Sequence, residues 1–199
     1  MEKKRLSGKR GEVKKYTEYE ENKKSGGDRV NEGKNLKEIM QMSMLISLGI
    51  TLQIAESFIA VPFFLPGVKL GLANIVTIIA LYVFGMKEAL KIGFMRVFLA
   101  SILRNGLGIN FLFSLSGMIF SLLVSGALKK IGKMSVSGVS MAGANFHVTA
   151  QIITASFIYR TDLLYISYLP YMLLITLITG LITGYLADRV LKRINFESF

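Results

Sequence analysis

The stretch "LPGVKLGLANIVTIIALYVFG", residues 65–85, places Lys69 and Asn74 in an otherwise apolar run that opens with a Pro-Gly pair. Proline and glycine mark turns, so we expect the chain to turn at Pro66 and Gly67 and a helix to follow. An apolar helix of this kind belongs either to a soluble core or to a membrane. The rest of the chain decides between the two.

The composition is that of a membrane protein. Of the 199 residues, 52% are hydrophobic and only 19% are charged, and the mean hydropathy is +0.49. Half of the 24 lysines and arginines lie within residues 1–38, so charge is sparse elsewhere, as in chains with several membrane spans. Cysteine is absent and there is one histidine, which excludes a disulfide and an ordinary zinc site.

Six apolar runs predict six helices, at residues 39–61, 70–84, 89–103, 109–128, 139–159 and 169–187. A span needs about 20 residues, so the runs 70–84 and 89–103 are short and either cross with little tilt or form a re-entrant hairpin. We expect an all-α integral membrane protein with about six transmembrane helices in residues 38–193. Residues 1–37 are expected to form a disordered cytoplasmic tail, and residues 194–199 a cytoplasmic end.

Basic residues predict the orientation of these helices. With the N-terminus inside, the cytoplasmic side carries 20 lysines and arginines, and the outer side carries 3, at Lys69, Arg104 and Arg160. Cytoplasmic loops are enriched in lysine and arginine, so both termini are expected in the cytoplasm and the chain in the cytoplasmic membrane. This topology accounts for the net charge of +11 without nucleic acid as a partner.

Polar side chains inside the predicted spans are candidates for function, because they are costly in a membrane. Asn74 lies about one turn beyond Lys69. Glu56, near the outer end of the first helix, is the expected partner of Lys69. Arg96 and Arg104 lie on roughly the same side of the third helix. Arg96 is expected either to snorkel or pair structurally, or to have a role as a ligand contact or in a relay.

The fifth predicted helix is the most polar of the six. Asn145, His147, Thr149, Gln151 and Thr154 lie within three turns. His147, Gln151 and Thr154 share a face, and Asn145 and Thr149 form a neighbouring row. Such a cluster fits a ligand site or a hydrogen-bond network between helices.

These residues define a candidate ligand site that opens to the outside, formed by Lys69, Asn74, Arg104, Asn145, His147 and Gln151. Bases outnumber acids on the outer side, which favours an anionic or acceptor-rich ligand. The alternative is structural: Lys69 only neutralises Glu56, and Asn74 only caps or bridges helices.

Small residues at four-residue spacing mark close helix contacts. We expect internal packing for the fourth helix at Gly117, Ser121 and Ser125, and for the sixth at Thr176, Gly180 and Gly184. The ridge on the first helix is expected to meet a partner subunit, with internal packing as the alternative. This ridge consists of Ser43, Ser47 and Thr51.

Motifs for catalysis are missing from the chain. There is no Gly-rich loop ending in Gly-Lys-Ser or Gly-Lys-Thr. The three aspartates are scattered, at Asp28, Asp162 and Asp188, and form no pair that could hold magnesium against a diphosphate. We therefore expect no catalytic residue, metal or cofactor in this chain.

The segments "PGVKLGLANIVTIIAL", "RVFLASILRNG" and "SLSGMIFSLLVSG" resemble a bacterial membrane family. Its members are named heptaprenyl diphosphate synthase component I and Gx transporter family protein, and the resemblance covers about residues 39–193. The family pattern Gly-Ala-x-x-His-Asn-x-Gly-Gln is matched at Gly143, Ala144, His147 and Gln151, but Val148 and Ala150 depart from it.

This family is similar to the S components of energy-coupling factor transporters, which are six-helix proteins that capture micronutrients on the outer face. The resemblance implies a substrate-binding membrane subunit whose partners are a transmembrane coupling subunit and two ATPases. It assigns the ridge on the first helix to the coupling contact. The older family name implies instead a membrane subunit associated with isoprenoid diphosphate synthesis, and a third interpretation is a membrane anchor of a redox or envelope complex.

Overall fold

A computed structural model of the chain describes residues 36–56, 71–104, 106–161 and 164–193. The chain divides into two units, Met1–Ser43 and Met44–Phe199. Of the first unit the structure describes residues 36–43, which are helical. The described residues of both units are helical apart from short turns and contain no strand. The predicted all-α fold is therefore confirmed.

The helices follow the predicted apolar runs. The first described helix is Leu36–Glu56, and it is followed by α2 (Leu72–Val83), α3 (Met86–Arg104), α4 (Ile109–Ile131), α5 (Val136–Tyr159), the π-helical turn η1 (Leu164–Tyr168) and α6 (Leu169–Arg193). The first helix begins two residues inside the predicted tail, because Leu, Lys and Glu are good helix formers. The other residues of that tail, 1–35, and the C-terminal end, 194–199, lie outside the described residues.

Three described helices are long and apolar enough to cross a membrane: Leu36–Glu56, Ile109–Ile131 and Ile166–Arg193. Helix α2, with 12 residues, is the short helix that was predicted; it measures about 18 Å at a rise of about 1.5 Å per residue. Helix α3 has 19 residues, more than its apolar run, because charged residues at both of its ends are also helical.

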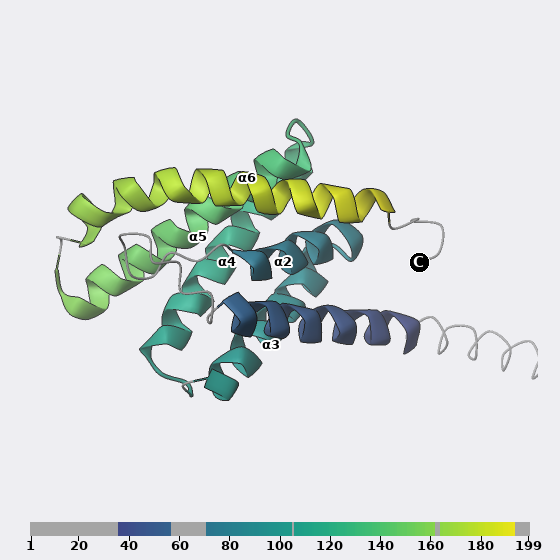
Figure 1. Ribbon diagram of the computed structural model, residues 1–199, viewed down its shortest axis with the longest axis horizontal. Coiled ribbons are helices and arrows are strands. Elements are labelled where there is room, and N and C mark those ends of the chain that lie inside the picture. The colour runs from purple at the N-terminus through teal and green to yellow at the C-terminus, as the bar shows by residue number, and fades with distance from the viewer. Residues whose placement is uncertain (1–35, 57–70, 105, 162–163, 194–199) are drawn as a thin grey trace, which may run out of the picture. The chain divides into compact units, whose positions relative to one another are not determined.

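Helix α5 packs against α6 on one side and against α4 on another (Figure 1). A Cβ atom on Gly180 would lie 2.8 Å from the Cα of Met141, and one on Gly184 would lie 2.7 Å from the Cα of Ser137. Backbones this close leave room only for glycine at these two positions. The small residues of the sixth helix therefore serve internal packing, as predicted.

The small residues of α4 also face α5. A Cβ atom on Gly143 of α5 would collide with the Oγ of Ser125 and lie 3.1 Å from the Oγ of Ser121. Ser125 is fully buried, and its hydroxyl donates to the carbonyl of Val139 at 3.5 Å. Internal packing by the small residues of the fourth helix is thus confirmed as well.

Side chains from other helices hold both ends of α2. The backbone N–H of Gly71, which precedes the helix with φ 77°, donates to the carboxylate of Glu56. At the other end the Nζ of Lys129 donates to the carbonyl of Leu81 at 2.7 Å and lies 4.9 Å from the centre of the Tyr82 ring. An acid at the start and a base at the end of a helix match its dipole.

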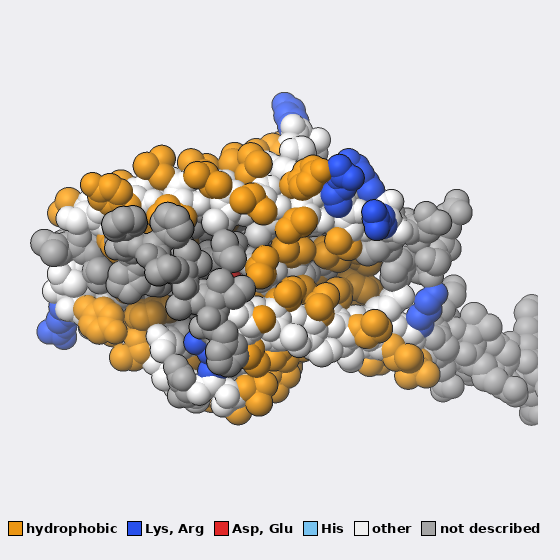
Figure 2. Space-filling view, viewed as in Figure 1, with side chains coloured by type: hydrophobic (Ala, Val, Ile, Leu, Met, Phe, Trp, Pro, Cys, Tyr) orange, Lys and Arg blue, Asp and Glu red, His pale blue; other side chains and the backbone are white. Residues whose placement is uncertain are grey.

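The surface of α6 is apolar along its length and basic where it ends. Figure 2 shows hydrophobic side chains over α6 and basic side chains gathered near its last turn. The exposed residues include Leu174, Ile178 and Leu181, and the last turn contains Lys192 and Arg193. An apolar flank with a basic end is typical of a helix that lies in lipid and reaches the interface.

Candidate ligand-binding cavity

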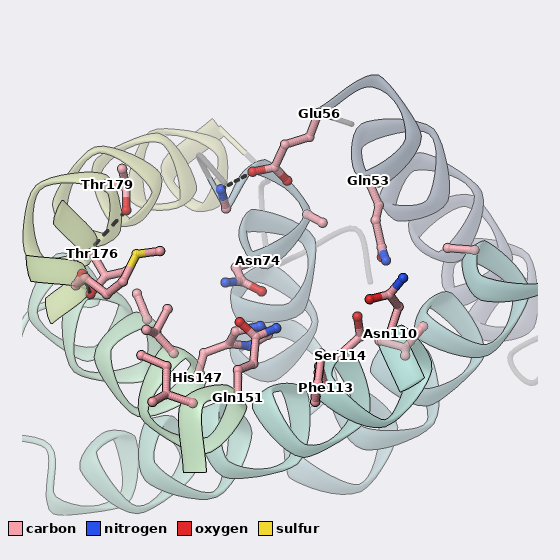
Figure 3. Close-up of a pocket in the computed structure, with 18 of the residues that line it drawn as sticks. Gln53, Glu56, Asn74, Asn110, Phe113, Ser114, His147, Gln151, Thr176 and Thr179 are labelled. Atoms are coloured by element: carbon pink, nitrogen blue, oxygen red, sulfur yellow. Dashed lines mark hydrogen bonds between the residues drawn. The ribbon is translucent and has the colours of Figure 1, made fainter. Parts of the chain in front are cut away.

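The unit Met44–Phe199 contains a cavity of about 500 Å³ that is lined by residues of the first described helix and of α2 to α6. Pockets for small molecules in proteins have volumes of about 300–1,000 Å³. Figure 3 shows polar side chains from several helices around this space. The size of the cavity and its polar lining fit a small-molecule site.

Three of the predicted site residues meet in this cavity. Asn74 comes from the first turn of α2, and His147 and Gln151 lie one turn apart on α5. In Figure 3 their side chains point into the same space. The two amides offer both donors and acceptors, and a neutral imidazole offers one of each. Two helices thus direct a varied set of hydrogen-bonding groups to one place.

The imidazole of His147 lies directly against α4. A Cβ atom on Gly117 would lie 2.8 Å from its Nε2 and 2.9 Å from both Cδ2 and Cε1. Three ring atoms would be in conflict at once, so even a methyl group at Gly117 would displace the ring. Gly117 therefore provides the space that the imidazole occupies.

Both arginines of α3 line the cavity, but they differ in burial. Arg96 is only 3% exposed, and its Nη1 donates to the Oε1 of Gln53 at 3.0 Å. A Cβ atom on Gly49 would lie 2.6 Å from the Cδ of Arg96, so the arginine side chain passes over this glycine. Arg96 therefore stays inside the helix bundle and pairs with Gln53, whereas Arg104, at the end of α3, is exposed.

Glu56 contributes a carboxylate to the lining of the cavity. It is 6% exposed and accepts the N–H of Gly71, an interaction that Figure 3 shows. Lys69, its predicted partner and a predicted ligand-binding residue, lies outside the described residues.

The structure does not bring Asn145 to the cavity. The Oδ1 of Asn145 accepts a hydrogen bond from the Oγ1 of Thr176 at 2.6 Å, which links α5 to α6. Thr154 does not line the cavity either, and its hydroxyl donates to the carbonyl of Ala150 in its own helix at 2.8 Å. Of the predicted ligand-binding residues, Asn74, Arg104, His147 and Gln151 line the cavity.

Several polar lining residues were not singled out from the sequence: Gln53, Asn110, Ser114 and Thr179. Two of them could have been identified from their positions in the sequence. Gln53 is a polar residue inside the first apolar run, three residues before Glu56. Asn110 is a polar residue at the second position of the fourth run, six residues after Arg104.

The ridge on the first helix is exposed. In the larger unit Ser47 and Thr51 are exposed, and their hydroxyls donate to backbone carbonyls of the same helix, at 3.2 Å and 2.9 Å. Ser43, which belongs to the smaller unit, is exposed too, and its hydroxyl donates to the carbonyl of Ile39 at 2.9 Å.

In the part of the chain that the structure describes, no group of three His, Cys, Asp or Glu residues could hold a metal ion.

No curated protein and no solved structure matches the chain. A model of the family described as "Heptaprenyl diphosphate synthase component I" matches residues 45–190. This range covers most of the chain and includes all the residues that line the cavity. The chain therefore belongs to the heptaprenyl diphosphate synthase component I family.

Proposed function

We propose that this chain is the substrate-binding subunit of a membrane transporter, similar to the S components of energy-coupling factor systems, and that it captures a micronutrient from the outside. One observation carries the proposal: Asn74, His147 and Gln151 converge in a cavity of about 500 Å³ inside a membrane protein. All three side chains are half-buried, and a molecule that fills the cavity would cover them, which is costly unless it offers them hydrogen bonds. The cavity therefore suits a ligand with several hydrogen-bonding groups.

The remaining walls of the cavity fit a recognition site. Phe113, Val148, Ile152 and Met172 line it with apolar surface, and small-molecule sites in proteins combine apolar walls with a few placed polar groups. The apolar walls exclude water, and the polar groups select and orient the ligand. Uptake would then need partner subunits, and the exposed helix face at Ser47 and Thr51 is the surface that we assign to a coupling subunit.

The family name favours a second candidate function. A "component I" implies another component, so the chain is alternatively the membrane subunit of a heptaprenyl diphosphate synthase. In that case Ser47 and Thr51 would contact the synthase partner, and the cavity would bind a molecule connected with isoprenoid synthesis. Purification of the tagged chain from its native membrane separates the two functions, because the first predicts recovery of ATPase and coupling subunits and the second predicts recovery of a prenyl synthase subunit.

The binding proposal is tested by the small molecules that co-purify with the full chain in detergent, identified and quantified by mass spectrometry. Asn74→Ala and Gln151→Ala should each weaken binding by about 1–3 kcal/mol, because each leaves a ligand group unpaired in a buried site. Thr154→Ala is the matched control, since it removes a hydroxyl from the same helix outside the cavity. Equal ligand recovery from all the variants and the wild type would show that the cavity is not the binding site.

A further inference from the structure

We propose that the ligand of this cavity carries an anionic group, and that the guanidinium of Arg96 binds it. This inference rests on the proposed function, because it names the chemical class of the ligand of the same cavity. It comes from the burial and the pairing of Arg96, which the sequence alone does not reveal.

Arg96 is a buried cation that lines the cavity. The residue that accepts from its Nη1, Gln53, is neutral. Its Nε is buried and has no hydrogen-bond partner among the described residues. A guanidinium taken out of water is costly until an opposite charge and matching acceptors face it. The forked donors of arginine match the two oxygens of a carboxylate or a phosphate.

The described part of the chain does not supply that counter-charge at contact distance. Two ion pairs form between described residues, Lys91–Glu88 at 3.7 Å and Lys192–Asp188 at 2.6 Å. Neither includes Arg96. The carboxylate of Glu56 attracts Arg96 from beyond ion-pair distance, while it accepts the N–H of Gly71 at the start of α2. An anionic ligand group beside Arg96 would complete the pairing.

The second arginine of α3 indicates how an anion would approach. Arg104 also lines the cavity but is exposed, and it lies eight residues, a little over two helical turns, from Arg96. An exposed cation and a buried cation that line the same cavity both attract an anion to it. Asn74 and Gln151 remain available to hydrogen-bond the rest of the molecule. The ligand is thus an anion with further polar groups.

The test separates ligands by charge before binding. A small-molecule extract of bacterial cells is divided by anion exchange into an anionic fraction and a flow-through of neutral and cationic molecules. Each fraction is incubated with the immobilised full chain in detergent, and retained molecules are quantified by mass spectrometry. We expect a molecule from the anionic fraction to be retained. Phosphatase treatment of that fraction beforehand distinguishes a phosphate monoester or diphosphate, which would be lost, from a carboxylate, which would persist.

Variants test the role of Arg96 itself. Arg96→Met should lower retention by about tenfold or more, the usual effect of losing a charge-assisted hydrogen bond, whereas Thr154→Ala should retain as much as the wild type. Arg96→Lys, which keeps the charge without the fork, should bind at an intermediate level, and it provides the test if Arg96→Met does not fold. Equal retention by Arg96→Met and the wild type overturns the role of Arg96. If a molecule is retained from the flow-through alone, the ligand is not an anion, so this inference is overturned and the proposed function stands. If no molecule is retained from either fraction, the inference and the proposed function are both overturned.

Discussion

At the scale of single residues, two glycines make room for two candidate ligand-binding side chains. Gly49 lies under the stem of Arg96, and Gly117 lies under the imidazole of His147. Glycine weakens a helix interior by roughly 0.5–1 kcal/mol relative to alanine, so its presence at these positions has a local cost that close packing offsets. Gly117 could be recognised from the sequence as a contact position. The side chain that fills the space depends on how two helices are aligned, which a single sequence does not give.

Gly117→Ala tests this arrangement. The added methyl group conflicts with three atoms of the His147 ring, so the variant should unfold at lower temperature, with a cost of about 1–3 kcal/mol from overpacking, and should bind ligand more weakly. Thermal unfolding in detergent, followed by far-UV circular dichroism, measures the first effect. The double variant Gly117→Ala/His147→Ala should recover part of the lost stability, because the ring has been removed. If it is no more stable than Gly117→Ala, the conflict is with another group.

The positions on α5 show which site residues the sequence could identify. Successive helical residues are rotated by about 100°, so Asn145 and His147, two positions apart, point in widely different directions. His147 and Gln151, four positions apart, point the same way, and both line the cavity. The sequence therefore separates Asn145 from His147 into different rows. It does not tell which row faces a cavity and which faces α6, because that depends on the position of the neighbouring helices.

At the scale of helices, the contact between α5 and α6 depends on two glycines that touch backbone. Gly184→Ala should destabilise the protein by about 1–3 kcal/mol, because its Cβ would lie 2.7 Å from the Cα of Ser137. Gly126→Ala is the matched control: its Cβ would meet only the flexible end of Met86, at 2.8 Å, and alanine favours the helix. Thermal unfolding of the two variants should therefore differ clearly. Equal midpoints would mean that α6 can shift to accept the methyl group.

On the exposed face of the first helix, a substitution should affect partner binding and not stability. Ser47→Leu should change the free energy of unfolding by less than about 0.5 kcal/mol, because Ser47 is exposed. It should nevertheless reduce the recovery of partner subunits when the tagged chain is purified from its native membrane. Gly49→Ala, two residues away on the buried side, should destabilise the chain instead, because its Cβ would lie 2.6 Å from Arg96. A large loss of stability in Ser47→Leu would assign this face to internal packing.

At the scale of the whole molecule, the topology can be tested with single cysteines, because the natural chain contains none. Leu107 and Met134 are exposed and lie just outside the two ends of α4. A membrane-impermeant thiol reagent should label Leu107→Cys in intact cells, and should label Met134→Cys only after permeabilisation. The cysteine-free wild type controls for background. Labelling of Met134→Cys in intact cells would contradict cytoplasmic termini.

The fold was more predictable than the cavity. Apolar runs interrupted by charged turns indicate where helices form, because a helix satisfies its own backbone groups in lipid, and the observed helices follow those runs. Helix α3 exceeds its run because Lys87, Glu88 and Arg104 are helical although they are not apolar. The cavity joins Gln53, Asn110 and Thr179 from helices far apart in the sequence. No local pattern encodes that meeting, since it arises from packing.

The two charged contacts at the ends of α2 have a mechanical consequence. Sliding α2 along its axis by even one residue, about 1.5 Å, would pull Gly71 away from Glu56 at one end and Leu81 away from Lys129 at the other. Charge-assisted hydrogen bonds are strong where water is scarce, so both losses oppose the movement. Helix α2 is thus held against axial movement at both ends, and Asn74, in its first turn, keeps its position along the bundle.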